Sequence, residues 1–550
     1  MKRDVLTQLA LTSTLFLSMA CSSEETTKQE PTKGQQDTKE LTAFVVEDNS
    51  TKTRTTAEYD GSGLNFYWTE GDRLWVNNGT LIQDASNNID LKLENHPTIP
   101  SAVKRAATAK FYFNGTFTAP SYPVRYTGKG NTFGDKVTIK AQQNQNIAND
   151  ASHIGEDGDC GTAVATKPAG GSKYNFTLEH KAAYLTFTPY NSQNAISAVH
   201  IAQIKVTADK AICGQFDFND NGIDVDNSRP ATTPANQSIT LTLNGAAANT
   251  GFPIPGGSSN ASKNAAVMVL APGTYNTFTV EYLLRDNATN INKTIVKTYN
   301  NLTLNAGRNR RVTTDLQVKD YSPWFDYYYM WDAVNPYWYG KNLPTVIENG
   351  GNYSSYGVPT ASDGTNRWYN TAYSGAGLAT QASVSCKDLP NVNEMYYYMV
   401  KGDLHYDGGS IWAFRGHLYW GEAWIKKQKV IYNELKAKGY TQLTSQSDMK
   451  EKFYSSATDA TGIDFRVNSL YVNTFNSIGR PSDTSDYFYL PALGYFLSGS
   501  LYNMSYGFYW TSTGVPNAGG NAYKFSFYAG QMNIYNSNTR AYGFIAHTFE

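Results

Sequence analysis

The residues of this chain that could carry out covalent chemistry are a thiol and two imidazoles. Cys386 with His405 or His417 could in principle form a thiolate–imidazolium pair. No local motif surrounds any of the three, and no nucleophile, base and orienting group can be named together. A lone cysteine beside an apolar strand is more often a packing residue. The sequence therefore predicts that the protein is not an enzyme.

A second chemical pattern is the first half of a calcium-binding loop. It consists of Asp217, Asn219, Asn221 and Gly222, with Asp224 and Asp226 nearby. The second half fails, because Ser228 occupies the position where the loop needs a bidentate carboxylate. Two strands joined by a turn are the simpler interpretation. We therefore expect no metal ion and no cofactor.

Cys21 is the third candidate, as an attachment site for lipid. It follows a basic start and an apolar run over residues 9–20 that is too short to cross a bilayer. Its spacing resembles the lipobox of bacterial lipoproteins, although Ser18 stands where an aliphatic residue is commonest. We predict a signal peptide over residues 1–20 and lipidation of Cys21. An ordinary secreted protein with a chance cysteine is the alternative.

The composition agrees with a surface protein. Residues 21–40 are too polar to bury anything and are predicted to form a flexible tether. The net charge is −1 and 17% of the residues are charged, which argues against a nucleic-acid partner because that needs a basic field. We expect a protein anchored by its lipid to the cell outer membrane and exposed on the surface.

Three further cysteines remain, namely Cys160, Cys213 and Cys386. Two of them could pair in an oxidising compartment, but their spacing does not say which.

From residue 41 to about 316 the chain is a series of short β-type runs with turn signals between them. The strands that alternate most clearly are expected at residues 41–46, 110–113, 136–140, 184–187, 204–207 and 238–243. Trp68 and Trp75 are expected to pack in a core, with a turn at residues 70–72 between them. His180 is expected to be a core histidine. The fold class is therefore mainly β.

Several blocks in this region occur in an order that resembles a known family. They are TRT (53–55), FYWTEGDRLWV (66–76), FYFNG (111–115), YPVRYTG (122–128), FTLEHKAAYLTF (176–187), CGQF (213–216), APGTY (271–275) and LNAGR (304–308). Together they resemble the fimbrillin-type lipoproteins, the subunits of type V pili. The resemblance implies two transthyretin-like β-sandwiches, which we place at residues 41–190 and 191–318.

The resemblance also implies assembly by donor-strand exchange, with other pilin subunits as partners. In that family a protease that cuts after arginine removes the first strand together with the lipid. Arg54 is the nearest match in this chain. The alternative is that Arg54 is a surface residue of a lipoprotein that is never cut.

Residues 319–550 differ in composition and are predicted to form a separate domain. Residues 426–438 are the best helix candidate, ending at Gly439. The blocks LPALGY (490–495), YGFYWTST (506–513), AYKFSF (522–527) and RAYGF (540–544) resemble the Fib-succ-major family. That resemblance implies an α+β, C-type-lectin-like fold. His547 departs from the arginine with which the family usually ends.

Binding is the expected role of this last domain. Exposed tyrosine and tryptophan can stack on sugars or fill protein pockets. Trp412, Tyr419, Tyr506 and Trp510 are the candidates for contact with a glycan or protein ligand, although core packing is favoured for Trp510.

Together these features predict a surface lipoprotein that acts as a tip or minor subunit of a type V-like pilus. A large domain after the fimbrillin-like part should cap the polymer. One alternative is a permanently anchored glycan- or protein-binding protein that does not polymerise. A surface enzyme would require a convergent polar pocket that the sequence does not show.

Overall fold

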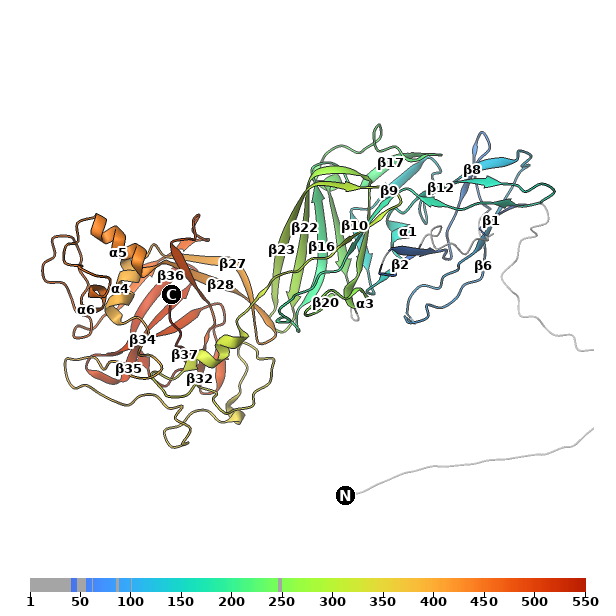
Figure 1. Ribbon diagram of the computed structural model, residues 1–550. Coiled ribbons are helices and arrows are strands. Elements are labelled where there is room, and N and C mark those ends of the chain that lie inside the picture. The colour runs from blue at the N-terminus through green and yellow to red at the C-terminus, as the bar shows by residue number, and fades with distance from the viewer. Residues whose placement is uncertain (1–40, 47–55, 62, 86–88, 100, 246–249) are drawn as a thin grey trace, which may run out of the picture.

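The computed structural model of the protein describes residues 41–46, 56–61, 63–85, 89–99, 101–245 and 250–550. Strands dominate, which confirms the predicted mainly β class. Figure 1 shows an elongated molecule in which an N-terminal sheet, a central set of sheets and a C-terminal region follow one another. The six strands expected before residue 316 are all present, within a few residues of their expected limits.

The first sheet runs in the order β5-β4-β8-β12-β13-β1-β7-β6, and β14 also pairs with β12. Its strands are β1 (Thr42–Val46), β4 (Trp75–Asn77), β5 (Leu81–Gln83), β6 (Ile89–Leu91), β7 (Ala109–Phe113), β8 (Ser121–Tyr126), β12 (Gly161–Thr166), β13 (Tyr174–Asn175) and β14 (Glu179–His180). An aromatic core covers one face of this sheet, where Trp68 lies edge-on to Phe111 and Tyr126. The predicted packing role of Trp68 is confirmed, whereas Trp75 is only half-buried.

The central region is built on a sheet of order β10-β19-β16-β22-β23, with β20 on β16. Its strands are β10 (Gln142–Gln145), β16 (His200–Ala208), β19 (Ser238–Leu243), β20 (Phe252–Pro253), β22 (Gly273–Asp286) and β23 (Ile291–Leu304). Three small sheets complete the region: β11 (Asp150–Ala151), β2 (Thr56–Tyr59) and β3 (Leu64–Tyr67); β21 (Ala266–Leu270), β15 (Ala183–Phe187) and β24 (Asn309–Val312); β18 (Gly222–Ile223), β17 (Gly214–Asn219) and β9 (Lys136–Ile139). Helices are short here: α1 (Ile154–Asp157), α2 (Pro234–Gln237) and α3 (Ala261–Asn264).

Strand pairing crosses the boundary predicted near residue 190. Strand β9 pairs with β17, β10 pairs with β19, and β15 pairs with both β21 and β24. Strands that precede residue 190 therefore belong to the central sheets, together with strands that follow it. The limits at residue 190 and the transthyretin-like topology stay predictions.

The C-terminal region contains three sheets whose strands pair only with one another in the described part of the chain. The first is β25 (Lys319–Asp320), β27 (His405–Phe414), β28 (His417–Lys426) and β31 (Tyr487–Pro491), with β30 (Ser477–Ile478) on β27. The second is β26 (Tyr328–Tyr329), β37 (Phe544–Ile545), β34 (Gly507–Val515), β35 (Ala518–Tyr528), β36 (Gln531–Thr539) and β29 (Val472–Phe475). The third is β32 (Tyr495–Leu497) and β33 (Ser500–Tyr502).

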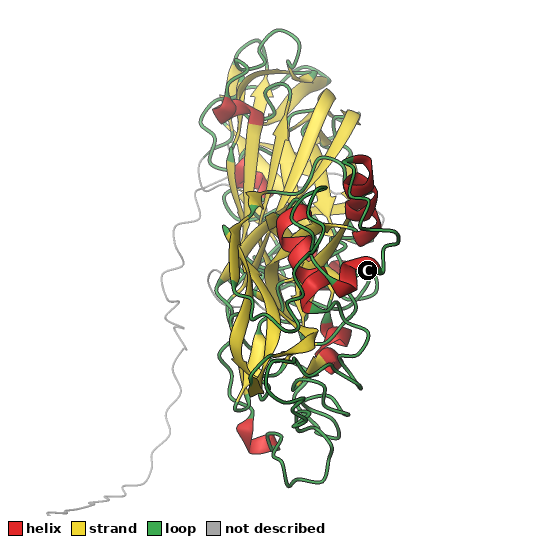
Figure 2. Ribbon diagram, turned by 90° about the vertical axis from the view of Figure 1, so that its left-hand side faces the viewer, coloured by secondary structure: helices red, strands yellow, loops and turns green. Residues whose placement is uncertain are grey.

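The longer helices belong to this region and lie outside its sheets (Figure 2). They are α4 (Val392–Lys401) and α5 (Gln428–Ala437). The region also contains the short helix α6 (Asp448–Glu451) and the 3-10 helices η2 (Ser322–Tyr327) and η3 (Ser354–Tyr356). Helix α5 confirms the predicted helix, and Gly439 after it adopts φ +85°. None of the helices in the described part of the chain has the length and apolarity that crossing a membrane needs.

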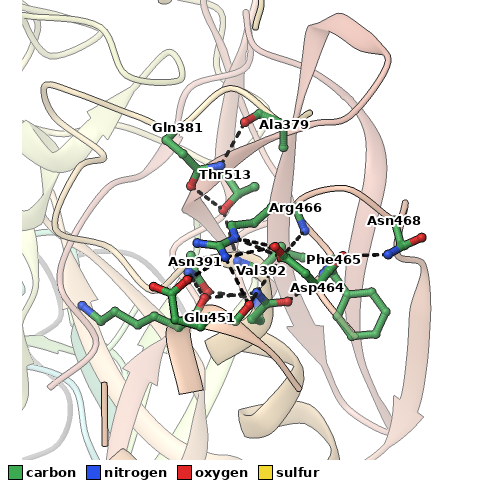
Figure 3. A network of polar contacts seen from close by, with 12 residues as sticks. Ala379, Gln381, Asn391, Val392, Glu451, Asp464, Phe465, Arg466, Asn468 and Thr513 are labelled. Carbon is green, nitrogen blue, oxygen red and sulfur yellow. Dashed lines mark hydrogen bonds and ion pairs between the residues drawn. The ribbon is translucent and has the colours of Figure 1, made fainter. Parts of the chain in front are cut away.

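Helix α4 begins in a polar network that joins three segments (Figure 3). Asn391 caps the helix in a capping box with Glu394. Arg466 forms ion pairs with Asp464 and Glu451, at 2.9 and 2.8 Å. The Asn393 amide donates to Asp464 at 2.9 Å, so the network fixes the helix against the loop that follows α6.

A buried carboxylate–histidine pair joins the central and C-terminal regions. Asp286, at the end of β22, accepts hydrogen bonds from His417 Nδ1 and from the Leu418 N–H, both at 2.9 Å. Lys293 of β23 also donates to the Gly408 carbonyl at 3.2 Å. Burial disfavours the Asp286 carboxylate, but these hydrogen bonds outweigh burial and hold its pKa below the ordinary value. The pair therefore favours folding while Asp286 is ionised.

Asp286→Asn tests this junction. Near neutral pH, the variant should lose about 1–3 kcal/mol of unfolding free energy, because two buried donors lose a charged acceptor. The folded pKa of Asp286 is depressed, so its contribution is complete above the unfolded pKa of about 3.9 and disappears as the pH falls through the folded value. Thermal unfolding of both proteins from neutral to strongly acidic pH measures the difference, which should shrink in acid.

Asp217→Asn is the matched control, since Asp217 pairs with Lys136 at an exposed site. Its loss should stay at about 0–1 kcal/mol. Equal losses in the two variants, or a difference unchanged in strong acid, would contradict the assignment.

Candidate functional site

Two of the predicted site residues, Cys21 and Arg54, lie outside the described residues. Lipidation at Cys21 and cleavage after Arg54 therefore stay predictions.

Three of the four predicted ligand-binding rings are buried. Trp412, Tyr419 and Trp510 are at most 1% exposed. Trp412 and Tyr419 are cross-strand partners on β27 and β28, and the Trp510 indole N–H donates to the Tyr329 carbonyl at 2.7 Å. A ring without an accessible face cannot stack on a ligand, so the predicted contacts of these three are wrong. The structure favours packing for Trp510, as the sequence analysis did.

Tyr506 is the predicted ring that remains accessible, at 41% exposure. It precedes β34 and stacks on Tyr528 of β35, with ring centroids 4.8 Å apart. A pair of stacked rings at the surface offers a flat apolar face beside polar hydroxyls.

The three described cysteines are unpaired and buried. Burial raises the pKa of the Cys386 thiol to about 12 and that of Cys213 to about 11. The predicted alternative partners of Cys386 are paired elsewhere, His405 with Asp403 and His417 with Asp286. A protonated, buried thiol is a poor nucleophile, so these residues do not form a thiolate site.

The calcium-like segment is a hairpin, as the simpler interpretation predicted. Phe218 pairs with Ile223, and Asn219 pairs with Gly222. Gly222 adopts φ +120° at the turn. Within the described residues, no group of three or more His, Cys, Asp or Glu side chains is placed to hold a metal ion.

His180 belongs to a buried polar cluster that the sequence did not reveal. Its Nδ1 lies 2.8 Å from Asp159 Oδ1, which also accepts from the Tyr184 hydroxyl. The imidazole stacks on Phe66 with centroids 3.8 Å apart, which agrees with a core position. Residues of β3, β14 and β15 meet in this cluster, so it joins the first sheet to the central region.

Strand β1 fills a slot in the interior of the first sheet. It pairs antiparallel with β7 along its whole length, from Thr42 opposite Phe113 to Val46 opposite Ala109. On its other edge it pairs in parallel with β13, with Phe44 opposite Tyr174. Removing β1 would leave the edges of β7 and β13 without these backbone hydrogen bonds.

The side chains of β1 are part of the aromatic core. Phe44 and Val46 are fully buried, and the Phe44 ring stacks on Tyr174 at 4.7 Å. Phe113 and Phe117 lie edge-on to the Phe44 ring, with ring centroids 4.9 and 5.3 Å away. The slot is therefore apolar and selects a strand with large apolar residues at alternate positions.

The last described strand is held inside its own sheet. Strand β37 lies between β26 and β34, and Phe549 beyond it is packed among aromatic rings. The Glu550 carboxylate accepts from the Tyr398 hydroxyl at 2.8 Å and from the Gln428 N–H at 2.6 Å. Residues 544–550 are thus bound on both sides and are not a loose strand.

No family model matches this sequence, and no curated protein matches it. Solved structures from the Bacteroidales give weak structural alignments. A candidate cell adhesion protein from Bacteroides fragilis aligns over 50% of this chain and 92% of its own, with 13% identity and a TM-score of 0.28. The fimbrial anchor protein Mfa2 from Porphyromonas gingivalis aligns over 48% and 83%, with 11% identity and a TM-score of 0.19. A fimbrial protein from Bacteroides ovatus aligns over 92% and 99%, with 10% identity and a TM-score of 0.22.

Phe44→Ala tests how strongly β1 is held. The variant should lose about 3–5 kcal/mol of unfolding free energy, because a large ring leaves a closely packed core. Denaturant unfolding measures the loss, and amide hydrogen exchange should rise in β7 and β13 before it rises in β16. Val296→Ala, at an exposed position of β23, is the control and should change stability by no more than about 0.5 kcal/mol. Unchanged exchange in β7 and β13 would mean that β1 does not depend on this ring.

The thiols give a second test. Iodoacetamide at mildly alkaline pH should leave Cys160, Cys213 and Cys386 unlabelled in the folded protein, because burial keeps them protonated and covered. All three should react in guanidinium chloride, as peptide mass mapping will show. Rapid labelling of Cys386 in the folded protein would contradict its burial and reopen the question of a reactive thiol.

Proposed function

We propose that this protein is a lipid-anchored surface protein that joins a type V-like pilus as its tip or minor subunit. In this proposal strand β1 is removed with the lipid, and a strand from a neighbouring subunit takes its place. Residues 319–550 then carry the ligand-binding part away from the cell.

The observation that supports the exchange is the position of β1 in chain and sheet. Its neighbours β7 and β13 come much later in the sequence, while residues 47–55 alone link it to β2, which belongs to another sheet. A cut after Arg54 would therefore separate β1 from the rest of the protein without touching any other described strand. The exposed apolar slot would favour a replacement strand, which is β-augmentation.

The proposed place at the tip is supported by residues 544–550. A subunit in the shaft must release one of its own strands to the next subunit. The last strand here, β37, has partners on both edges, and Glu550 and Phe549 anchor the residues after it. Within the described residues, β37 and the segment after it are therefore not free to be donated, which supports a subunit that accepts a strand.

The alternative is an anchored binding protein that never polymerises. What favours it is that β1 already fills the slot in the intact chain, with Phe44 and Val46 fully buried. A filled slot is stable without a partner, so exchange needs the proteolytic cut.

N-terminal sequencing and intact mass of the protein from sheared surface fibres and from outer membranes distinguish the two. Fibre material should begin at Thr55, whereas lipidated Cys21 material should occur in membranes. Arg54→Ala should prevent processing and abolish the fibre form, while Lys52→Ala, a nearby basic residue, should leave both unchanged. Lipidated material in membranes alone, for the unaltered protein, would overturn polymerisation and favour the anchored protein.

A further inference from the structure

The outer face of the sheet β34-β35-β36-β29 carries a regular array of side chains. Antiparallel pairing places directly opposite residues on the same face. Phe508, Ser526, Asn533 and Asn473 form one row across the four strands, according to the strand register. The neighbouring inward row, with Tyr509, Phe525 and Ile534, is fully buried in the main core. The first row therefore lies on the opposite face, where Phe508 packs in a second apolar cluster with Trp510 and Phe544. Ser526 and Asn533 are also buried, whereas Asn473 at the end of the row is exposed.

Aromatic rings stand on both sides of this row. On one side lie the stacked pair Tyr506 and Tyr528 and, opposite Gln531, the 82% exposed ring of Phe475. On the other side Tyr471, 56% exposed, meets Tyr535 edge-on at 5.0 Å. Four residues of a strand separate the two groups, a span of about 13 Å. That span suits several linked sugar rings better than one.

The row between the rings contains polar side chains that can form hydrogen bonds with a ligand. Asn533 is 2% exposed, and its side-chain oxygen has no hydrogen-bond partner among the described residues. A buried acceptor without a donor costs free energy, so a ligand hydroxyl placed here would be favoured. Ser526 beside it is 5% exposed, while Asn473 at the edge is exposed and can bond a further ligand hydroxyl.

Lys524 supplies a positive charge to the same face. Its ammonium lies 4.6 Å from the Phe508 ring centroid, 5.2 Å from Tyr535 and 5.3 Å from Phe544. Among the described residues, no acidic side chain contributes to the titration of Lys524. Burial lowers the pKa of Lys524 to about 8, with no acidic group to offset the effect. A ligand carboxylate would supply the missing counter-charge.

We propose that this face binds an acidic oligosaccharide, with sugar rings on the two aromatic groups, a hydroxyl on Asn533 and a carboxylate on Lys524. Sugars present apolar C–H faces and polar edges, which matches flat rings around a polar row. This inference rests on the proposed ligand-binding role of residues 319–550 and names the class of ligand.

Isothermal titration calorimetry on the mature full-length protein tests the proposal. The probes are hexasaccharides of hyaluronan, chondroitin and oligogalacturonate, each paired with its carboxyl-reduced counterpart. At least one acidic hexasaccharide should bind, and its reduced form should bind about tenfold more weakly. Lys524→Gln should remove that difference. Tyr506→Ala and Phe475→Ala should each weaken binding about tenfold, as expected when one aromatic contact is lost.

Tyr339→Ala removes a comparably exposed ring outside this face and should leave the affinity unchanged. The four variants should retain the thermal unfolding of the parent protein. Failure of all the acidic probes to bind, or binding that no variant on the face alters, would overturn the proposal. Calorimetry does not depend on polymerisation, so fibre material that begins at Thr55 together with absent glycan binding would reject this inference alone.

Discussion

Backbone groups inside a sheet must be hydrogen-bonded, and the first sheet of this protein meets that requirement through β1. The strands on either side of β1, β7 and β13, come from distant parts of the chain, and β1 closes the space between them. Its Phe44 ring completes a cluster with Phe113, Phe117 and Tyr174. Sheet continuity and core packing in this region therefore depend on one short strand near the start of the described chain. This strand completes the sheet, and a single cut in the segment that follows it would separate it from the rest of the chain.

Contacts made by the central region fix the position of the C-terminal region. Strands β22 and β23 form a long hairpin. Asp286 at the end of β22 accepts a hydrogen bond from the buried His417 side chain. Lys293 lies 5.1 Å from the Trp420 ring centroid and donates to Gly408 from the same hairpin. A buried, charged contact at the end of two long paired strands restricts how the two regions can move relative to each other. A ligand bound to residues 319–550 would then pull on the central sheet rather than on a loose linker.

The two faces of one sheet in the C-terminal region have different surroundings. The inner face of β34, β35 and β36 packs into the main core. On the opposite face, a second apolar cluster covers Phe508 and Trp510 of β34, and rings and amides lie on β36 and β29. Lys524 in particular has aromatic neighbours, and among the described residues no acidic group offsets its burial. Stability alone does not require a cation at such a position, because desolvation disfavours it. The acidic ligand proposed above would supply the counter-charge that Lys524 lacks.

Local sequence patterns predicted the mainly β class, the six strands before residue 316, helix α5 and the hairpin at residues 214–223. These follow from local alternation, helical spacing and turn residues, which act over a few positions. Which strands become neighbours depends on contacts between distant segments, so the sequence does not predict that β9, β10 and β15 join the central sheets. The same reason explains why the predicted ligand contacts of Trp412 and Tyr419 were wrong, whereas the packing favoured for Trp510 agrees with the structure. A ring on a strand can be covered or open, and that depends on distant segments packed against its face. Tyr506 could be nominated from the sequence, but the row of Asn533 and Lys524 beside it exists only through cross-strand register.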